Sequence, residues 1–217
     1  MSRTDCEISN GTKSAGRPKS AEKRSSILCT ASELFLRLGY DRTSMDAVAK
    51  SSGVSKQTVY SHFKNKDILY TSVIEQKCNE YRIEEDAICI ETQGIEDLLN
   101  SIARNFVALL TDKSVIAMYS VVIGESKNNK RVAQLFYEAG PAHGNRLVRK
   151  LLASHPSTQL NSEEAKEVAT DFFNLLKGEY HMQSMLRLPF ESSPEKLAQF
   201  TQRVVHKTMM LINMHKK

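Results

Sequence analysis

The sequence contains no tryptophan and little glycine or proline. Among its 217 residues there are 9 glycines and 5 prolines, and runs of β-branched residues are short. The residues that most often interrupt helices are therefore scarce, which favours helix throughout the chain. No stretch approaches the roughly 18 uninterrupted apolar residues of a membrane span. We therefore expect an all-α protein without a membrane partner.

Cysteine is also sparse, and the N-terminus lacks an apolar segment. Residues 1–19 do not have the apolar core of a signal peptide and are interpreted as a flexible basic tail. Cys6, Cys29, Cys78 and Cys89 are widely spaced, without a CxxC pair or a Cys/His cluster. This spacing predicts neither a zinc site nor a disulfide framework and is typical of a reduced, cytoplasmic protein. We expect no cofactor and no metal.

Positive charge is concentrated in the first part of the chain. Residues 1–66 contain 12 Lys and Arg against 6 Asp and Glu, whereas the remainder contains 18 against 19. A local basic surface favours a polyanionic partner. A solvated face without any partner would have the same composition, so charge alone leaves both interpretations open.

Two helices are predicted at the start of the chain. Apolar residues at helical spacing predict the first over residues 20–39, ended by Gly39, which can adopt a positive φ. Thr43, with Asp46 three residues later, resembles a capping box and predicts the start of a second helix. Cys29 falls on the polar side of the first helix and is a candidate exposed, redox-sensing thiol.

Capping signals predict the other helices. Ser55 and Asn65 are caps for a third helix over residues 56–63 and for a fourth that runs from residue 66 towards residue 90. Later start signals are the pairs Asn161/Glu164, Gly140-Pro141 and Ser193-Pro194. Long helices are predicted over residues 95–112, 114–126, 130–140, 142–155, 163–188 and 195–216.

The second and third helices have the features of a helix-turn-helix. Ala49 is small where two helices must cross, and Gly53 suits a tight turn. Val54, Val59 and Phe63 are expected to face the first helix. The opposite face of the third helix then remains in solvent. An ordinary helical hairpin with solvated polar residues is the alternative interpretation.

The outward face of the third helix carries side chains suited to DNA. Lysine can reach guanine, glutamine can pair with adenine, and a threonine methyl group can contact thymine. Tyrosine, histidine and further lysines suit phosphate, as does a backbone N–H at a helix start near Thr43. The predicted DNA contacts are Thr43, Ser44, Ser55, Lys56, Gln57, Thr58, Tyr60, Ser61, His62, Lys64 and Lys66.

Residues 23–70 resemble the N-terminal domain of the TetR family of bacterial transcriptional regulators. The matching elements are Gly39-Tyr40, Thr43-Ser44, Gly53-Val54-Ser55 and Tyr60-x-His62-Phe63-x-Asn65-Lys66. The stretch LFYEAGPAHGNRLVRKLL is similar to the C-terminal domain of AefR-like members. The resemblance implies a homodimer in which an N-terminal three-helix unit binds operator DNA. It also implies a larger helical domain that binds a small molecule and dimerises through the two C-terminal helices.

The expected organisation is therefore a tail over residues 1–19, a helix-turn-helix domain over 20–66, and an effector-binding and dimerisation domain over 67–217. We expect a sequence-specific regulator, most simply a repressor of a pseudo-palindromic operator, released by a small apolar or amphipathic effector. The alternatives are a DNA-binding architectural protein without an effector, or a helical enzyme. We expect no enzyme, because the sequence lacks GxSxG, HExxH and a glycine-rich phosphate loop.

Large side chains of the C-terminal part are candidates for a ligand pocket, although such residues at helical spacing more often form a core. His181 is also a potential metal ligand, but no second ligand lies four residues away. Glu125 and Asp171 lie on otherwise apolar faces and are expected to make core or interface contacts. The predicted pocket residues are Met118, Tyr119, Phe136, Phe172, Phe173, Leu176 and His181.

Overall fold

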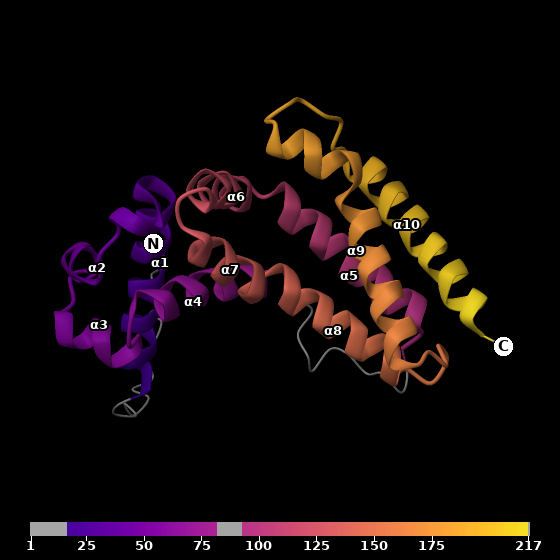
Figure 1. Ribbon diagram of the computed structural model, residues 1–217, viewed down its shortest axis with the longest axis horizontal. Coiled ribbons are helices and arrows are strands. Elements are labelled where there is room, and N and C mark those ends of the chain that lie inside the picture. The colour runs from indigo at the N-terminus through magenta and orange to yellow at the C-terminus, as the bar shows by residue number, and fades with distance from the viewer. Residues whose placement is uncertain (1–16, 82–92, 217) are drawn as a thin grey trace, which may run out of the picture.

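The computed structural model describes residues 17–81 and 93–216, which form helices and no strand (Figure 1). The all-α prediction is confirmed. The predicted basic tail, apart from its last three residues, lies outside the described residues, as do Cys6 and Cys89. The helices are α1 (Arg17–Arg42), α2 (Met45–Ser52), α3 (Lys56–His62), α4 (Lys66–Asn79), α5 (Ile95–Thr111), α6 (Lys113–Ser126), α7 (Lys130–Ala139), α8 (Pro141–Ser154), α9 (Ser162–Met185) and α10 (Pro194–His215).

Polar side chains start several helices at the predicted positions. The side-chain oxygens of Ser55, Asn65 and Ser193 each accept a hydrogen bond from the backbone N–H three residues later. Asn161 and Glu164 form a reciprocal capping box at the start of α9. These bonds satisfy donors that the first turn of a helix leaves free. The four predicted starts are confirmed.

Several predicted boundaries are wrong, since the first helix runs from Arg17 to Arg42 and not over residues 20–39. Ser44, not Thr43, caps α2, because its side chain accepts from the N–H of Ala47. Thr43 is unavailable for this role, since its hydroxyl donates to the carbonyl of Gly39 at 2.7 Å. The fourth helix ends at Asn79 and is followed by a turn, so it does not continue towards residue 90 as one helix.

The helices are arranged with α1, α2 and α3 at one end of the molecule and α9 and α10 at the other (Figure 1). Between these ends, α4 packs on α1 and on α7, and α6 also packs on α1. At the far end α8 packs along α9, and α10 packs along α5. The N-terminal unit thus packs on the rest of the protein through α4 and α6 and not through α4 alone.

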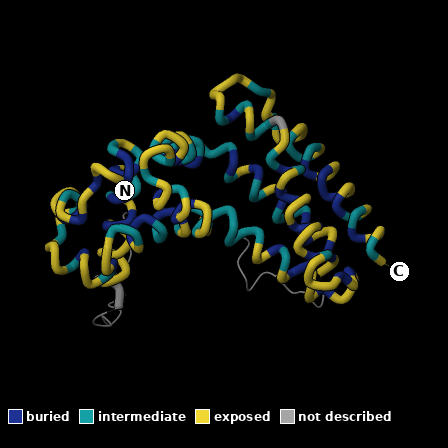
Figure 2. The backbone as a smooth tube through the Cα atoms, in the orientation of Figure 1, coloured by how far each residue is buried: buried dark blue, intermediate teal, exposed yellow. Residues whose placement is uncertain are grey.

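The buried apolar side chains form two clusters, visible as dark-blue stretches along the helices (Figure 2). The first cluster includes residues of α1 to α4 and also of α6 and α7, such as Phe35, Tyr70 and Phe136. The second is built from α5, α8, α9 and α10 around residues such as Leu99 and Phe172. The first cluster therefore extends beyond the predicted helix-turn-helix segment into helices of the predicted effector domain.

Asp112 joins three elements at the start of α6. Its carboxylate accepts hydrogen bonds from the N–H groups of Ser114 at 2.7 Å and Val115 at 3.1 Å. The Tyr81 hydroxyl donates to it at 2.6 Å, and the Lys77 ammonium lies 3.1 Å away. Burial acts to raise the pKa of Asp112, but hydrogen bonds from Ser114, Tyr81 and Lys77 outweigh it and hold the pKa well below its ordinary value.

Asp112→Asn is expected to make the stability of the protein less sensitive to acid. A carboxylate with a depressed pKa stabilises the fold above its unfolded pKa, and this contribution is lost as the pH falls through the folded pKa. The free energy of unfolding of the wild type should therefore decrease below about pH 4 more steeply than that of the variant. Urea unfolding at pH 7 and pH 3 measures the difference. Asp171, expected to make a core or interface contact, is exposed and not part of the core, so Asp171→Asn is the control. Identical acid slopes for wild type and Asp112→Asn would contradict the prediction.

Candidate nucleic-acid interface and ligand cavity

The turn between α2 and α3 fixes the orientation of α3. Gly53 lies in the left-handed region with φ 68°, and its N–H donates to the carbonyl of Ala49. Glycine adopts this conformation without the steric penalty of a side chain. On α3 itself Val59 is fully buried, and Phe63, just after the helix, is 1% exposed. One face of α3 is therefore anchored in the first cluster, as predicted for a helix-turn-helix.

The opposite face of α3 is open to solvent. Among the predicted DNA contacts, Thr58 and His62 are half-buried. The exposed ones are Ser44, Ser55, Lys56, Gln57, Tyr60, Ser61 and Lys64. These side chains come from the start of α2, from α3 and from the segment that follows α3. They form one polar surface, which we call the α3 face.

An ion pair on the α3 face links the two helices. Lys56 Nζ lies 2.8 Å from a carboxylate oxygen of Asp46, and both side chains are more than 60% exposed. The hydrogen bond with Asp46 raises the pKa of Lys56, which stays charged at neutral pH. Exposed ion pairs of this kind contribute little to stability, so Lys56 can exchange Asp46 for another anion.

Two predicted DNA contacts have partners inside the protein. Thr43 is 1% exposed, and both its backbone N–H and its hydroxyl donate to carbonyls of the last turn of α1. Lys66 Nζ donates to the carbonyl of Tyr40 at 2.9 Å and lies 4.2 Å from the centre of the Tyr40 ring. The structure therefore places Thr43 away from the α3 face and uses Lys66 to hold the end of α1.

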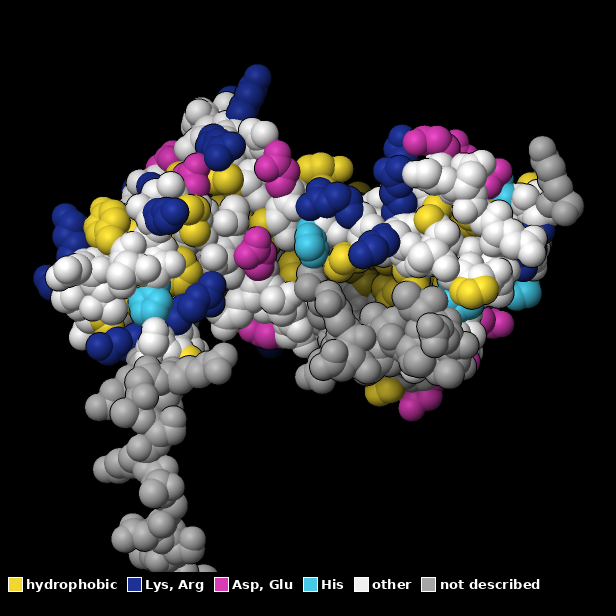
Figure 3. Space-filling view, turned by 90° about the horizontal axis from the view of Figure 1, so that it is seen from below, with side chains coloured by type: hydrophobic (Ala, Val, Ile, Leu, Met, Phe, Trp, Pro, Cys, Tyr) yellow, Lys and Arg dark blue, Asp and Glu magenta, His cyan; other side chains and the backbone are white. Residues whose placement is uncertain are grey.

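Further exposed basic residues of α1 and α2 were not predicted individually. Lys23, Arg24 and Lys50 are exposed. The Arg24 guanidinium lies 5.1 Å from the centre of the Phe63 ring. Lys and Arg side chains are spread over the surface at this end of the molecule (Figure 3). The charge count of residues 1–66 indicated such residues, but it could not show which of them lie next to α3.

Glu125 of α6 binds the backbone at the end of α1. Its carboxylate accepts hydrogen bonds from the backbone N–H of Tyr40 at 3.0 Å and, more weakly, from that of Asp41 at 3.4 Å. Asn129, beyond the end of α6, donates to the Asp41 carboxylate at 2.7 Å. Gly39, with φ 81°, breaks the regular helix as a kink inside α1, which continues to Arg42 beyond the predicted end. Glu125 therefore makes a contact between elements, of the kind predicted for it, and this contact joins α6 to the end of α1.

Asp67 makes a second link between the same parts. It accepts a hydrogen bond from the Tyr40 hydroxyl. It also accepts two hydrogen bonds from the guanidinium of Arg131 of α7, both at 3.1 Å. The hydrogen bond from Tyr40 lowers the pKa of Asp67, and Arg131 and Lys66 lower it further against the effect of burial. Asp67 therefore stays ionised, and its charge ties α1, α4 and α7 together.

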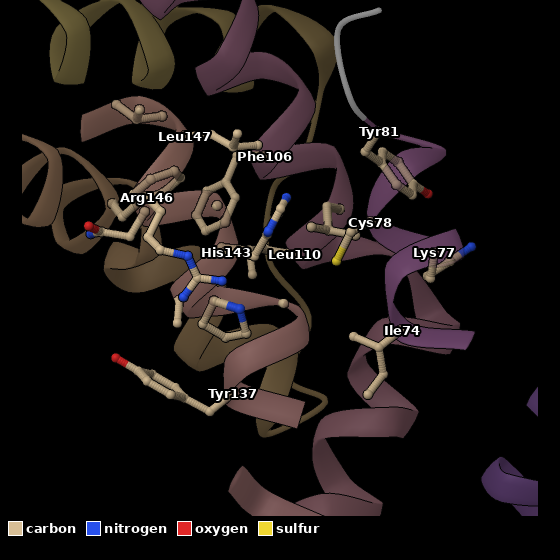
Figure 4. A pocket seen from close by; sticks show the side chains of 18 of the residues that line it. Ile74, Lys77, Cys78, Tyr81, Phe106, Leu110, Tyr137, His143, Arg146 and Leu147 are labelled. Carbon is tan, nitrogen blue, oxygen red and sulfur yellow. The ribbon is translucent and has the colours of Figure 1, made fainter. Parts of the chain in front are cut away.

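The protein also contains a cavity of about 740 Å³. Its wall is formed mainly by α4 to α9, with two residues of α1. Figure 4 shows Ile74 and Cys78 of α4 facing Phe106 and Leu110 of α5 across it. Its size falls within the range of small-molecule sites, and its contact with α4 places it next to the helix that follows α3.

Four of the seven predicted pocket residues line this cavity, namely Met118, Tyr119, Phe136 and Phe173. Burial raises the pKa of Tyr119 to about 12, so its phenol is neutral in the wall. Phe172 and Leu176 do not line it and are almost fully buried in the second hydrophobic cluster, to which Phe173 also belongs. Helical periodicity could not show which of these residues line the cavity, because Phe172 and Phe173 are consecutive apolar residues of the same helix.

His181 also lies outside the cavity wall. Its ring packs 5.3 Å from that of Tyr119, and its buried Nδ1 has no hydrogen-bond partner. Burial lowers the pKa of His181, and the nearby Lys177 lowers it further. In the described ranges no group of three or more His, Cys, Asp or Glu residues is placed to hold a metal.

Several residues of the cavity wall were missed by sequence reasoning. Lys77, Tyr137, His143 and Arg146 all line it, as does Cys78. Their only signal in the sequence is their presence on the predicted fourth helix and around the Gly140-Pro141 break. Such a signal cannot show which side of a helix faces a cavity, since that depends on how distant helices pack.

Within residues 17–81 and 93–216, no single helix is long and apolar enough to cross a bilayer. The pair α5 and α6 together has the length and composition for a span, but it is bent by 65°. Six of the α5 residues, from Ile95 to Leu110, are buried in the protein.

Comparison with known proteins finds a family match for the N-terminal part of the chain and another for the C-terminal part. Residues 27–73 match the model of bacterial regulatory proteins of the tetR family, and residues 97–211 match that of the C-terminal domain of AefR-like transcriptional repressors. The chain is similar to the transcriptional activator FasR of Mycolicibacterium smegmatis, with 38% identity over 66 residues, 30% of either chain. It is 28% identical to the fatty acid metabolism regulator protein of Bacillus subtilis over 102 residues, 46% of this chain and 52% of that one. The matches thus span between 30% and 52% of the length of these curated relatives.

Solved structures share the fold over nearly the whole chain. A TetR-family regulator from Mesorhizobium loti superimposes with a TM-score of 0.68 at 23% identity, covering 90% of this chain and 98% of that chain. The flavonoid-responsive regulator FrrA superimposes with a TM-score of 0.67 at 27% identity, covering 88% and 96%. The helix-turn-helix and the cavity-bearing helices thus occur together in both.

Proposed function

The chain belongs to the TetR family of bacterial transcriptional regulators, and from this premise we propose that it is an operator-binding repressor released by a small molecule. The observation that carries the proposal is the pairing of the α3 face with a cavity that α4 borders. A repressor is favoured over an activator by the AefR-like repressor model, which matches 97–211. FasR, named an activator, is similar only over 66 residues.

The α3 face is proposed to enter the major groove of DNA. Its exposed Lys56, Gln57 and Tyr60 project from a helix that is held on its other side by Val59 and Phe63. We propose that Lys56 and Gln57 contact base edges and that Lys64 contacts phosphate. Because Thr43 and Lys66 have internal partners, their proposed role is to orient α3 and α4.

The unit that binds DNA is proposed to be a homodimer formed through α9 and α10. Met182, Met210 and Met214 on these helices, and Leu186 just after α9, are each more than half exposed, so a second subunit can bury them. Pairing these residues with those of a second subunit would relate the two α3 faces by a two-fold axis. A pseudo-palindromic operator should then have half-site centres about 34–36 Å apart.

Release is proposed to pass through the contacts of Glu125 and Asp67. A ligand can change DNA binding only if it binds the DNA-competent and the incompetent arrangement with unequal affinity. The cavity wall includes residues of α4, α6 and α7. Asp67 of α4 and Glu125 of α6 accept hydrogen bonds from Tyr40, and Arg131 of α7 donates to Asp67. A ligand that moves these helices would therefore move the end of α1.

Footprinting of the purified protein on its own genomic DNA tests the proposal. Protection of paired half-sites is expected, and a reporter placed behind the protected site should be more active when the protein is absent. An organic extract of the host cells, added to the footprinting reaction, should remove the protection. No protected fragment at low salt would contradict DNA binding, and protection that no extract alters would contradict release.

Single substitutions in the α3 face should distinguish a side chain that contacts a base from one that contacts phosphate through its charge. Lys64→Ala is expected to weaken binding to all DNA sequences and to reduce the slope of log K against log salt concentration by about one unit. Gln57→Ala is expected to lose about 1–3 kcal/mol of discrimination at one base pair. Gel-shift titrations on operator variants at several salt concentrations measure both effects.

The matched control is Lys216→Ala, an exposed lysine at the opposite end of the molecule (Figure 1). It should bind DNA as the wild type does, with the same salt slope. If Gln57→Ala lost equal affinity for every sequence, the proposed base-reading role of Gln57 would be wrong.

A further inference from the structure

The described wall of the cavity is positively charged. It contains Asn, Ser and Thr side chains and many apolar ones, but no Asp or Glu. Burial keeps the Tyr119 phenol protonated, so this tyrosine adds no negative charge. The basic residues that line the cavity are Lys77, His143, Arg146, Arg149, Lys150, Lys166 and Lys177. A wall of this composition distinguishes ligands by the sign of their charge.

Some of these positive charges are already neutralised. Lys77 pairs with Glu80 at 2.7 Å and with Asp112 at 3.1 Å. In Figure 4 its ammonium group points away from the cavity. Lys166 pairs with Glu163 at 3.0 Å. Neither lysine is therefore an available partner for a ligand.

Three other lining cations have no carboxylate partner within 4 Å among the described residues: Arg146, Lys150 and Lys177. Within residues 17–81 and 93–216, the Arg146 guanidinium makes a single hydrogen bond, a long one at 3.5 Å to the carbonyl of Glu138. Figure 4 shows the Arg146 side chain extending into the cavity, on the same side as Tyr137 and His143. A guanidinium offers several donors in a planar array that fits carboxylate and phosphate groups.

The start of α8 adds to this positive region. Pro141, Ala142 and His143, the first three residues of α8, line the cavity, and no side chain caps the helix. A helix N-terminus carries a partial positive charge and free N–H groups. Arg146 lies in the next turn of the same helix, so the helix end and the guanidinium favour the same sign of ligand charge.

The remaining wall is apolar. Phe106 and Phe173 meet edge to face at 4.7 Å between ring centres, and Tyr119 and Phe136 do so at 4.8 Å. Figure 3 shows hydrophobic side chains at the surface of the central part of the molecule, with Lys, Arg and His side chains beside them. The cavity thus offers an apolar surface for the body of a ligand and a basic edge for one end of it.

We infer that the ligand of this cavity is an anionic amphiphile, whose acidic head group binds Arg146 and whose apolar body lies against the aromatic wall. The shared chemistry is a carboxylate or phosphate on a hydrophobic chain or ring system. The inference rests on the proposed role of the cavity as the effector site. Arg146 is the residue that selects the head group, and Lys150 and Lys177 contribute long-range attraction.

Calorimetric titration of the purified full chain, without DNA, tests the charge of the ligand. The probes share one twelve-carbon chain and differ in head group: dodecanoate and dodecyl phosphate, dodecanol, and dodecyltrimethylammonium, all below their micellar concentrations. Dodecanoate or dodecyl phosphate should bind about tenfold or more tightly than dodecanol, as a charge-assisted hydrogen bond implies. The cationic probe should bind most weakly. Comparison of dodecanoate with dodecyl phosphate distinguishes a carboxylate ligand from a phosphate ligand.

Arg146→Gln should remove the preference for anions without reducing the affinity for dodecanol. Arg104→Ala, which removes an exposed arginine of α5 that does not line the cavity, is the control and should bind all probes as the wild type does. Thermal melts confirm that both variants fold. The comparison of head groups on the wild type does not depend on either variant.

The inference is overturned if the neutral or cationic probe binds as tightly as the anionic ones, if no probe binds, or if folded Arg146→Gln keeps the preference for anions. Operator release, measured separately, reports on the proposed function. Anion-selective binding that leaves the operator occupied would contradict release and support the ligand class. Release by the cationic probe would support effector control and contradict the ligand class.

Discussion

Phe63→Ala is expected to lower the free energy of unfolding by about 3–5 kcal/mol and to abolish specific operator binding. Phe63 is 1% exposed and ends α3, where it packs in the first hydrophobic cluster. Truncation leaves a cavity beneath α3, and the guanidinium of Arg24 loses the ring that lies 5.1 Å from it. Because α3 then loses its anchor, the α3 face loses its fixed orientation. Urea unfolding and gel-shift titration measure the two effects.

Tyr60→Ala separates loss of contact from loss of anchoring. Tyr60 is 43% exposed and lies on the α3 face, three residues before Phe63. Its removal is expected to change the free energy of unfolding by about 0.5 kcal/mol or less and still to weaken DNA binding. A Phe63→Ala protein with unchanged stability and unchanged operator affinity would show that α3 is not held by this side chain.

Gly39→Ala is expected to destabilise the protein by about 2–5 kcal/mol from two sources. The backbone of Gly39 has φ 81° and ψ 174°, a region that is essentially restricted to glycine and that costs other residues about 1–3 kcal/mol. A Cβ at this position would also overlap Oε1 of Glu125. The displaced carboxylate would leave the N–H of Tyr40 without its partner, which costs about 1–3 kcal/mol.

A double-mutant cycle with Glu125→Ala tests the second source. When the carboxylate is already absent, the Cβ has nothing to displace and only the backbone strain remains. The double variant should therefore lose less free energy of unfolding than the sum of the two single variants. Gly124→Ala is a matched control, because a Cβ there meets open space; in a helix it should be neutral or stabilising by up to about 1 kcal/mol. Additive single effects would show that Glu125 is not the obstacle.

Signals between neighbouring residues predicted much of the fold. Ser55, Asn65, Asn161 and Ser193 each cap the helix that they were expected to start. Gly53 has the positive φ that its place in the turn required. Such features depend on hydrogen bonds over two to four residues, so the local sequence contains the information needed to recognise them.

The same signals failed where a neighbouring element competes for a side chain. Thr43 has the residue type of a cap, but the last turn of α1 takes its hydroxyl and leaves the role to Ser44. Lys66 has the charge of a phosphate contact, but Tyr40 provides a carbonyl and a ring that bind it. In both cases the competing group comes from α1, and only its packing against the following helices decides the outcome.

The sequence by itself determined the helices, most of their caps and the polar face of α3, because each depends on residues a few positions apart. Only the tertiary structure decided that Glu125 accepts a hydrogen bond from the N–H of Tyr40, 85 residues away, and that Phe173 lines a cavity whereas Phe172 does not. It also decided that Arg146, Lys150 and Lys177 face one cavity without a described carboxylate. The physical reason is that packing between distant helices sets which side of each helix faces a core, a cavity or solvent. The helical periodicity of the sequence is the same in all three cases.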